Sequence, residues 1–132
     1  MCNQNEWIVR EAFLAYDKGD VARMMTHVHP DLDWIYFEPS GADSRPAVRH
    51  GRGELEAALR HRADLGLRAQ VEEVVAAGEQ VLLVTRTLGV DKVLGNGNSD
   101  LSYEVVTVRD GLIVGLRACK DRDEARTLVG IS

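Results

Sequence analysis

The spacing of apolar residues changes once along this 132-residue chain, from the three-to-four spacing of helices to the alternation of strands. In the first half, residues 6–18 repeat apolar side chains at helical spacing. Gly19 is suited to end that helix, and Asp20 is suited to cap a second one. The second half alternates in twos over residues 68–77, 80–90, 101–110 and 112–120. Helices followed by hairpins predict an α+β fold, with helices packed on one face of a curved sheet.

Turn signals divide the second half into hairpins. Gly78-Glu79 and Asp110-Gly111 are tight-turn pairs, and a longer loop carries Gly95-Asn96-Gly97-Asn98. Consecutive hairpins predict an antiparallel meander. The other expected elements are a second helix to residue 28 ended by Pro30, a strand over 31–38, a loop over 39–49, a third helix over 52–65 and a short closing helix over 121–129.

Composition narrows the class of protein. The chain has 16 Lys+Arg against 21 Asp+Glu, a net charge of −5, which disfavours nucleic acid as the main partner. No uncharged apolar run approaches the roughly 18 residues that cross a membrane. The first residues lack the basic and apolar regions of a signal peptide, so we do not expect secretion. Cys2 and Cys119 lie at opposite ends and form no CxxC pair. We expect a single domain over residues 1–132, located in the cytoplasm and independent of nucleic acid and membranes.

An aromatic strand supplies the first candidate binding residues. Trp34 and Tyr36 alternate with Glu38, so the three side chains share one face of the strand. One interpretation makes the two aromatic rings the walls of a pocket for a flat apolar ligand. The other makes them part of the core under the helices, and the sequence allows both.

Histidine spacing gives no metal site. On a helix that runs to Pro30, His27 and His29 point about 200° apart. His50 precedes the third helix and is a candidate polar contact at a pocket mouth, and no cofactor is expected. A basic stretch follows, which is either a solvated rim or a guide for an anionic ligand. Its members are Arg45, Arg49, Arg52, Arg60, Arg62 and Arg68.

Several motifs together resemble the SnoaL-like part of the nuclear-transport-factor-2-like superfamily, over nearly the whole chain. They are Lys18-Gly19-Asp20, Glu38-Pro39-Ser40-Gly41, His50-Gly51-Arg52-Gly53-Glu54-Leu55, Val108-Arg109-Asp110-Gly111-Leu112-Ile113-Val114 and Asp121-Arg122-Asp123-Glu124-Ala125. The resemblance implies a cone-shaped fold, in which a bent sheet wraps helices and leaves a pocket at the open end. Members include ketosteroid isomerases, polyketide cyclases, limonene epoxide hydrolases, dehydratases and proteins without known activity. Fold alone therefore does not determine function.

The epoxide-hydrolase pattern is not preserved. Its ionisable positions correspond to Thr85, Thr87 and Ala118, none of which carries a charge. Arg86 lies between the two threonines, but strand alternation sends it to the opposite face. That chemistry is therefore not expected, while the three uncharged residues stay candidates for the pocket lining.

The ketosteroid-isomerase pattern is preserved in part. Glu38 in Glu38-Pro39-Ser40-Gly41 matches the base, and Glu104 matches the second acid on the penultimate strand. By this resemblance, Glu38 removes a proton beside a carbonyl while a protonated Glu104 donates a hydrogen bond to the developing enolate.

Two residues depart from that pattern. Phe13 stands where the family has a tyrosine, and Tyr16, one turn later, is a possible replacement. Lys120 shares strand parity with Ala118, so it can form an ion pair with Glu104 and keep that carboxylate charged. We therefore expect weak or no isomerisation of a 3-ketosteroid.

These observations leave two functions open: an isomerase, cyclase or dehydratase acting on a small apolar, polyketide-like or steroid-like molecule, and a non-catalytic ligand-binding or protein-interaction module. Either way, the architecture predicts that Trp34, Tyr36, Thr85, Thr87, Glu104, Ala118 and Lys120 converge on a cavity. The resemblance also implies a homodimer formed through the outer sheet face. A strand apolar on both sides supports it, because both the Val81–Leu83 and the Leu82–Val84 series need cover.

Overall fold

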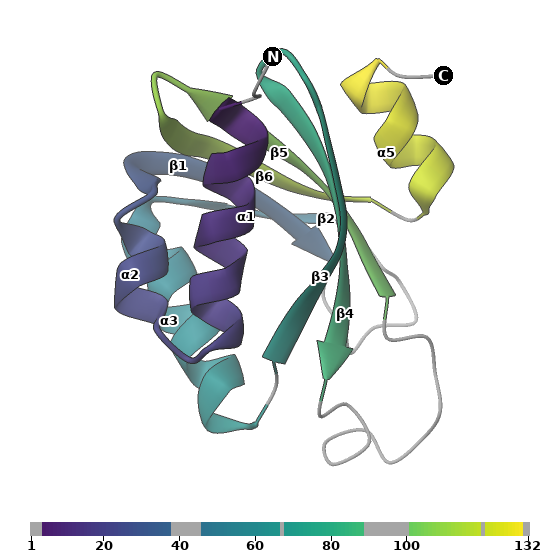
Figure 1. Cartoon of the computed structure of the whole chain (residues 1–132). Coiled ribbons are helices and arrows are strands. Elements are labelled where there is room, and N and C mark those ends of the chain that lie inside the picture. Colours follow the sequence, from purple (N-terminus) through teal and green to yellow (C-terminus); the bar gives the residue numbers. More distant parts are fainter. Residues whose placement is uncertain (1–3, 38–45, 67, 89–100, 120, 131–132) are drawn as a thin grey trace.

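The computed structural model of the chain has a six-stranded sheet with helices on both faces (Figure 1). The structure describes residues 4–37, 46–66, 68–88, 101–119 and 121–130, without the side chains of residues 36–37, 46–49 and 87–88. The helices are α1 (Gln4–Asp17), α2 (Val21–Met25), α3 (Arg52–Asp64) and α5 (Arg122–Val129). The strands are β1 (Val28–Phe37), β2 (Pro46–His50), β3 (Arg68–Ala77), β4 (Gln80–Leu88), β5 (Leu101–Arg109) and β6 (Leu112–Cys119).

The predicted meander is confirmed. Strands β3 to β6 pair in sequence as antiparallel neighbours, and β1 joins β6 in parallel to give the order β2-β1-β6-β5-β4-β3. The turn between β5 and β6 has Asp110 at φ 53° and Gly111 at φ 82°. Positive φ at both positions gives the twist that two antiparallel strands need, which is why Asp-Gly predicted this hairpin.

The segment before α3 differs from the prediction. The second helix ends at Met25 and β1 begins at Val28, so His29 and Pro30 belong to a strand. Pro30 is tolerated there because the pairing with β2 starts only at Asp33 and the register with β6 shifts between Val28 and Asp33. Residues 46–49, expected in a loop, belong to the edge strand β2.

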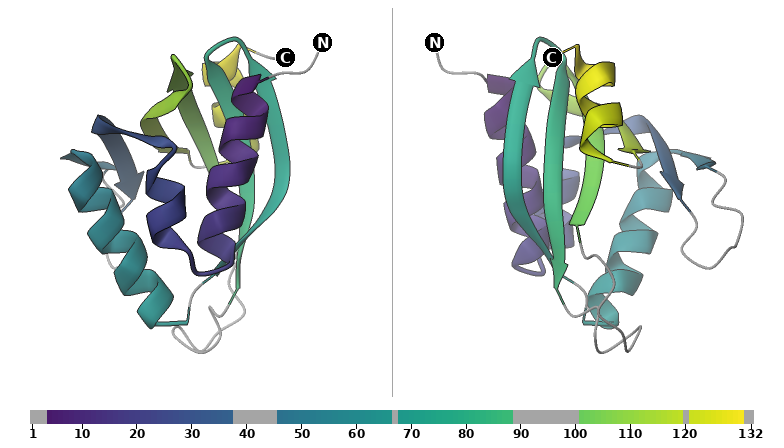
Figure 2. Two further views of the ribbon diagram at one scale, coloured as in Figure 1. Left: turned by 60° about the vertical axis from the view of Figure 1, so that its left-hand side comes forward. Right: turned by 90° about the vertical axis from the view of Figure 1, so that its right-hand side faces the viewer.

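Three helices bury one face of the sheet. Figure 2 shows α1, α2 and α3 together on that side, with the sheet curving around them. Val9, Met24, Leu83, Val106 and Ile113 are fully buried in the resulting core. The amphipathic stripes of the two N-terminal helices therefore meet the inward-facing residues of the meander, as the periodicity predicted.

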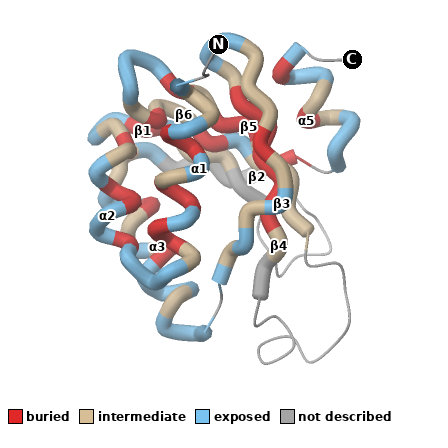
Figure 3. The backbone as a smooth tube through the Cα atoms, viewed as in Figure 1, coloured by how far each residue is buried: buried red, intermediate tan, exposed pale blue. Residues whose placement is uncertain are grey.

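Helix α5 covers the opposite face of the sheet (Figure 2). Leu82, Val84 and Val105 from the strands pack there with Ala125 and Val129 of α5. Asp121 caps this helix by accepting a hydrogen bond from the Glu124 amide at 2.9 Å. Figure 3 shows the buried residues of β4 and β5 running between the two helical layers. The Leu82–Val84 series is thus covered by the chain's own closing helix, so it gives no support to a homodimer.

Among the described residues, no helix is long and apolar enough to cross a membrane.

Two adjacent leucines of β4 test this two-sided packing. Leu82 and Leu83 face opposite sides of the sheet and are 1% and 0% exposed. We expect Leu82→Ala and Leu83→Ala each to lower the free energy of unfolding by about 2–5 kcal/mol, because each leaves a cavity in a packed layer. Urea denaturation followed by circular dichroism measures both.

Leu65, which is 45% exposed, provides the control, and Leu65→Ala should change stability by about 0.5 kcal/mol or less. If Leu82→Ala cost no more than this control, α5 would not pack on the second face in solution.

Candidate functional site

A cavity of about 680 Å³ lies between the helices α1 and α3 and the inner face of the sheet. Its volume is in the range that accommodates small organic ligands. Most of the wall is apolar, with Phe13, Trp34, Leu55, Leu59 and Leu116 contributing the larger side chains. Its polar lining includes Tyr16, Glu54, His61, Arg62, Arg68, Thr85, Ser102 and Glu104.

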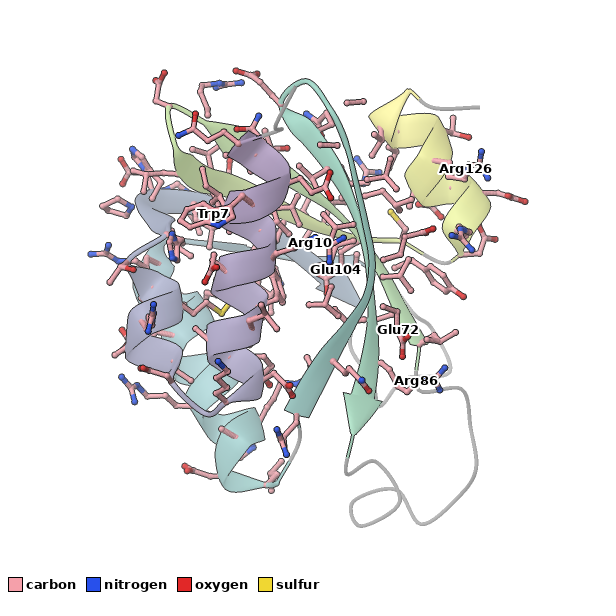
Figure 4. All side chains as sticks on the ribbon, in the orientation of Figure 1. Trp7, Arg10, Glu72, Arg86, Glu104 and Arg126 are labelled. Carbon is pink, nitrogen blue, oxygen red and sulfur yellow. The ribbon has the colours of Figure 1, made fainter. Side chains whose placement is uncertain are left out.

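Glu104 lines this cavity because of its place in the meander. It is on β5, opposite Leu83 on one neighbouring strand and Ala118 on the other. Strand alternation puts it on the same side as Val106, which is fully buried under the helices. Figure 4 labels Glu104 on this part of the sheet. A carboxyl group thus replaces an aliphatic side chain where the core gives way to the cavity.

Burial sets the protonation of Glu104. Removal from water raises the pKa of its carboxyl group, and the nearby charge of Arg62 opposes that rise without cancelling it. The folded environment therefore shifts Glu104 towards the neutral carboxylic acid, which donates a hydrogen bond, and away from the carboxylate, which only accepts.

Tyr16 is the second polar group at this point. Burial raises the pKa of its phenol, and the Glu104 carboxyl adds to the rise. The charge of Arg62 and a hydrogen bond from its guanidinium to Tyr16 lower it in part. Tyr16, Arg62 and Glu104, from α1, α3 and β5, therefore form one polar cluster in an apolar cavity.

Six predicted lining residues meet in this cavity: Phe13, Tyr16, Trp34, Thr85, Glu104 and Ala118. Glu38 and Lys120 lie outside the described residues, as do the side chains of Tyr36 and Thr87, so their roles stay predictions.

His50 is placed elsewhere. Its ring bonds the Asp33 carboxylate at 2.6 Å on the exposed edge of β1 and β2, and that bond raises the pKa of the imidazole. It does not line the cavity. Arg86 also lies outside and pairs with Glu72 at 2.8 Å, as strand alternation predicted (Figure 4).

The role of Arg62 was missed by treating the arginines as one basic rim. On α3, Leu55, Leu59 and Arg62 are spaced at i, i+4 and i+7, so all three belong to one helical face. This spacing could have identified Arg62 from the sequence. An arginine that continues the apolar face of a helix lies at the edge of the core, where a cavity can open.

Two other kinds of site find no support in the described part of the chain. No group of three or more metal-binding side chains gathers there. Cys119 lines the cavity edge, but burial raises the pKa of its thiol to about 11, so it is protonated near neutral pH and a poor nucleophile.

The fold and cavity define a class of protein: an α+β cone whose helices and bent sheet enclose a small-molecule-sized pocket. A family model described as a SnoaL-like domain matches residues 9–116. The chain therefore belongs to the SnoaL-like family, as the sequence motifs predicted.

Solved structures share the fold at low identity. A nuclear-transport-factor-2-like protein of unknown function from Burkholderia pseudomallei is 22% identical, with a TM-score of 0.70 over 97% of this chain and 98% of that one. A candidate polyketide cyclase from Sinorhizobium meliloti is 18% identical, with a TM-score of 0.67 over 85% and 93%. TerC, co-crystallised with polyporic acid, is 18% identical, with a TM-score of 0.64 over 97% and 99%. No curated protein matches the chain.

Replacing Glu104 by glutamine should change how stability depends on pH. The raised pKa means that the folded chain holds this proton more tightly than the unfolded chain. Its contribution to stability is present below the ordinary carboxyl pKa and is lost as the pH rises through the folded value. We therefore expect Glu104→Gln, which has no charge to desolvate, to be more stable than the wild type at neutral pH and to lose this advantage in acid.

Urea unfolding between about pH 4 and pH 8 measures the difference. Glu79→Gln is the control, since Glu79 is exposed and pairs with Arg109 at the surface. Equal pH slopes for the wild type and Glu104→Gln would show that folding does not raise the pKa of Glu104.

Proposed function

We propose that the chain binds a small, mainly apolar molecule of the polyketide or steroid type in its cavity and transfers a proton beside a carbonyl group of that molecule. The observation that carries this proposal is the half-buried Glu104 carboxyl, whose pKa is raised, in the same cavity as the Tyr16 hydroxyl. Two neutral donors in a low-dielectric cavity suit a carbonyl oxygen that gains negative charge during the reaction.

The proposed chemistry divides the work between two carboxyl groups. A base takes the proton from the carbon next to the carbonyl, and the electron pair moves onto the carbonyl oxygen to form an enolate. Glu104, with Tyr16, donates hydrogen bonds to that oxygen. Glu38 is the predicted base, on the sequence resemblance alone. Returning the proton to a different carbon gives an isomerase, and attack of the enolate carbon on a second carbonyl gives a cyclase.

Tyr16 strengthens the case for the family's donor arrangement. The sequence left open whether it replaces the hydroxyl that Phe13 lacks. Both residues line the cavity, and the Glu104 carboxyl lies close enough to influence the pKa of the Tyr16 phenol. Tyr16 is thus the available partner for Glu104 at the reacting oxygen.

Turnover of a polyketide and 3-ketosteroid panel tests the proposal. We expect Glu38→Gln to abolish turnover while ligand affinity is kept, because the base is lost and the shape is not. Glu104→Ala should lower kcat about 10²-fold, the usual cost of removing one donor to a developing oxyanion. Glu104→Gln should lose less, since an amide still donates a hydrogen bond.

Glu79→Gln, at the exposed surface, should keep wild-type kcat. Turnover that survives both Glu38→Gln and Glu104→Ala would contradict the mechanism. Tight binding with no turnover across the panel would favour the second candidate, a non-catalytic ligand-binding protein, which the apolar walls support equally well.

A homodimer is part of the proposal, because the resemblance implies pairing through the outer sheet face. Helix α5 covers only part of that face. A hollow lined by Ile35, Val105, Thr107, Val114 and Arg117, among others, lies on it outside the main core. Light scattering at micromolar concentration should give twice the 14.6 kDa mass of one chain, and the single-chain mass would contradict the dimer.

A further inference from the structure

We propose that the ligand of this cavity carries an acidic group, a carboxylate or an ionised enol, which the Arg62 guanidinium holds while the apolar body of the ligand lies against Trp34 and Leu116. This inference rests on the proposed function, because it specifies the class of molecule that the same cavity takes.

Arg62 is placed to meet a ligand from the solvent side. Its side chain is exposed, yet it lines the cavity together with the buried Leu55 and Leu59 of the same helix face. Its guanidinium donates a hydrogen bond to Tyr16 and acts on the charge of Glu104. The guanidinium therefore lies between bulk water and the polar cluster inside. Its several N–H groups leave donors over after the bond to Tyr16.

Within the described residues, Arg62 also has no ion-pair partner. None of the ion pairs found within the described ranges includes it. The pKa of Glu104, which lines the same cavity, is raised towards the neutral form. Glu54 also lines the cavity, but it lies two turns earlier on α3, about 12 Å along the helix axis.

The other arginine that lines the cavity, Arg68, already has an acidic partner. Arg68 donates a hydrogen bond to the Asp17 backbone carbonyl at 2.9 Å and lies 3.4 Å from the Asp17 carboxylate. Its guanidinium thus holds the C-terminal end of α1, where a cation is favoured by the helix dipole. Arg62 is therefore the cavity arginine best placed to bind a ligand anion.

The surroundings select the kind of anion. Arg62 is in the last turns of α3, near the end of the helix where the carbonyl groups carry partial negative charge. That field opposes any anion, and it opposes a doubly charged phosphate more than a singly charged carboxylate. A single guanidinium matches a carboxylate, which it binds through two parallel hydrogen bonds. The apolar walls then require that the rest of the molecule be hydrophobic.

A matched pair of probes tests this inference. Naphthalene-2-carboxylate and naphthalene-2-carboxamide have nearly the same shape, and only the first is charged at neutral pH. We expect isothermal titration calorimetry to give about five- to tenfold tighter binding of the carboxylate to the wild type. Arg62→Gln should remove this preference of carboxylate over carboxamide, and Arg62→Lys should retain part of it.

Arg60→Gln is the matched control on the same helix. Arg60 pairs with Glu56 at 2.7 Å and does not line the cavity, so its loss should leave the preference intact. The wild-type preference should also weaken as salt is raised, because the Arg62 side chain is exposed.

The outcomes separate this inference from the function on which it rests. Equal wild-type affinity for both probes, or a preference that survives in Arg62→Gln, would overturn the acidic-ligand inference and leave a cavity for neutral ligands. If neither probe bound, the inference would fail together with the apolar-ligand proposal. If Arg60→Gln lost the preference for the carboxylate equally, the preference would come from general surface charge, and the acidic-ligand inference would also be overturned.

Discussion

Strand β4 buries apolar side chains on both faces, and the rest of the fold depends on that constraint. Val81 and Leu83 need cover on one side, and Leu82 and Val84 need it on the other. The chain meets both needs itself, with α1 to α3 on the first face and α5 on the second. Helices thus pack on both faces of the meander. The cavity opens where the packing of α1 to α3 on the first face ends.

The change from core to cavity can be followed along two antiparallel strands, β4 and β5. Inward-facing residues along β4 change from Leu83 to Thr85, and those along β5 change in the reverse direction from Val106 to Glu104 and Ser102. Because Thr85 and Ser102 are paired across the strands, the polar ends of both series coincide. The site therefore arises from register, since a shift of one residue would turn Glu104 towards α5.

The sequence predicted the parts of this molecule that depend on short-range pattern. Alternation and the Asp110-Gly111 turn located the meander, and the family resemblance placed Glu104 and Thr85 on the cavity side. Prediction failed for β2 and the start of β1, because an edge strand and a proline-containing bulge are decided by distant partners. It also failed for Arg62, whose importance comes from the approach of α3 to Tyr16 and not from the basic stretch around it.

The charge of Arg62 links ligand binding to the protonation of Glu104 in the candidate site. Arg62 is the group that opposes the raised pKa of Glu104, so its field weakens the neutral carboxylic acid that the proposed chemistry uses. An anionic ligand on Arg62 would cancel that field, and the Glu104 carboxyl would then hold its proton more tightly. Binding and protonation would stabilise each other, as linkage requires. An acidic ligand would thus favour the protonated Glu104 that donates a hydrogen bond to it. A neutral ligand would leave the charge of Arg62 lowering the pKa of Glu104.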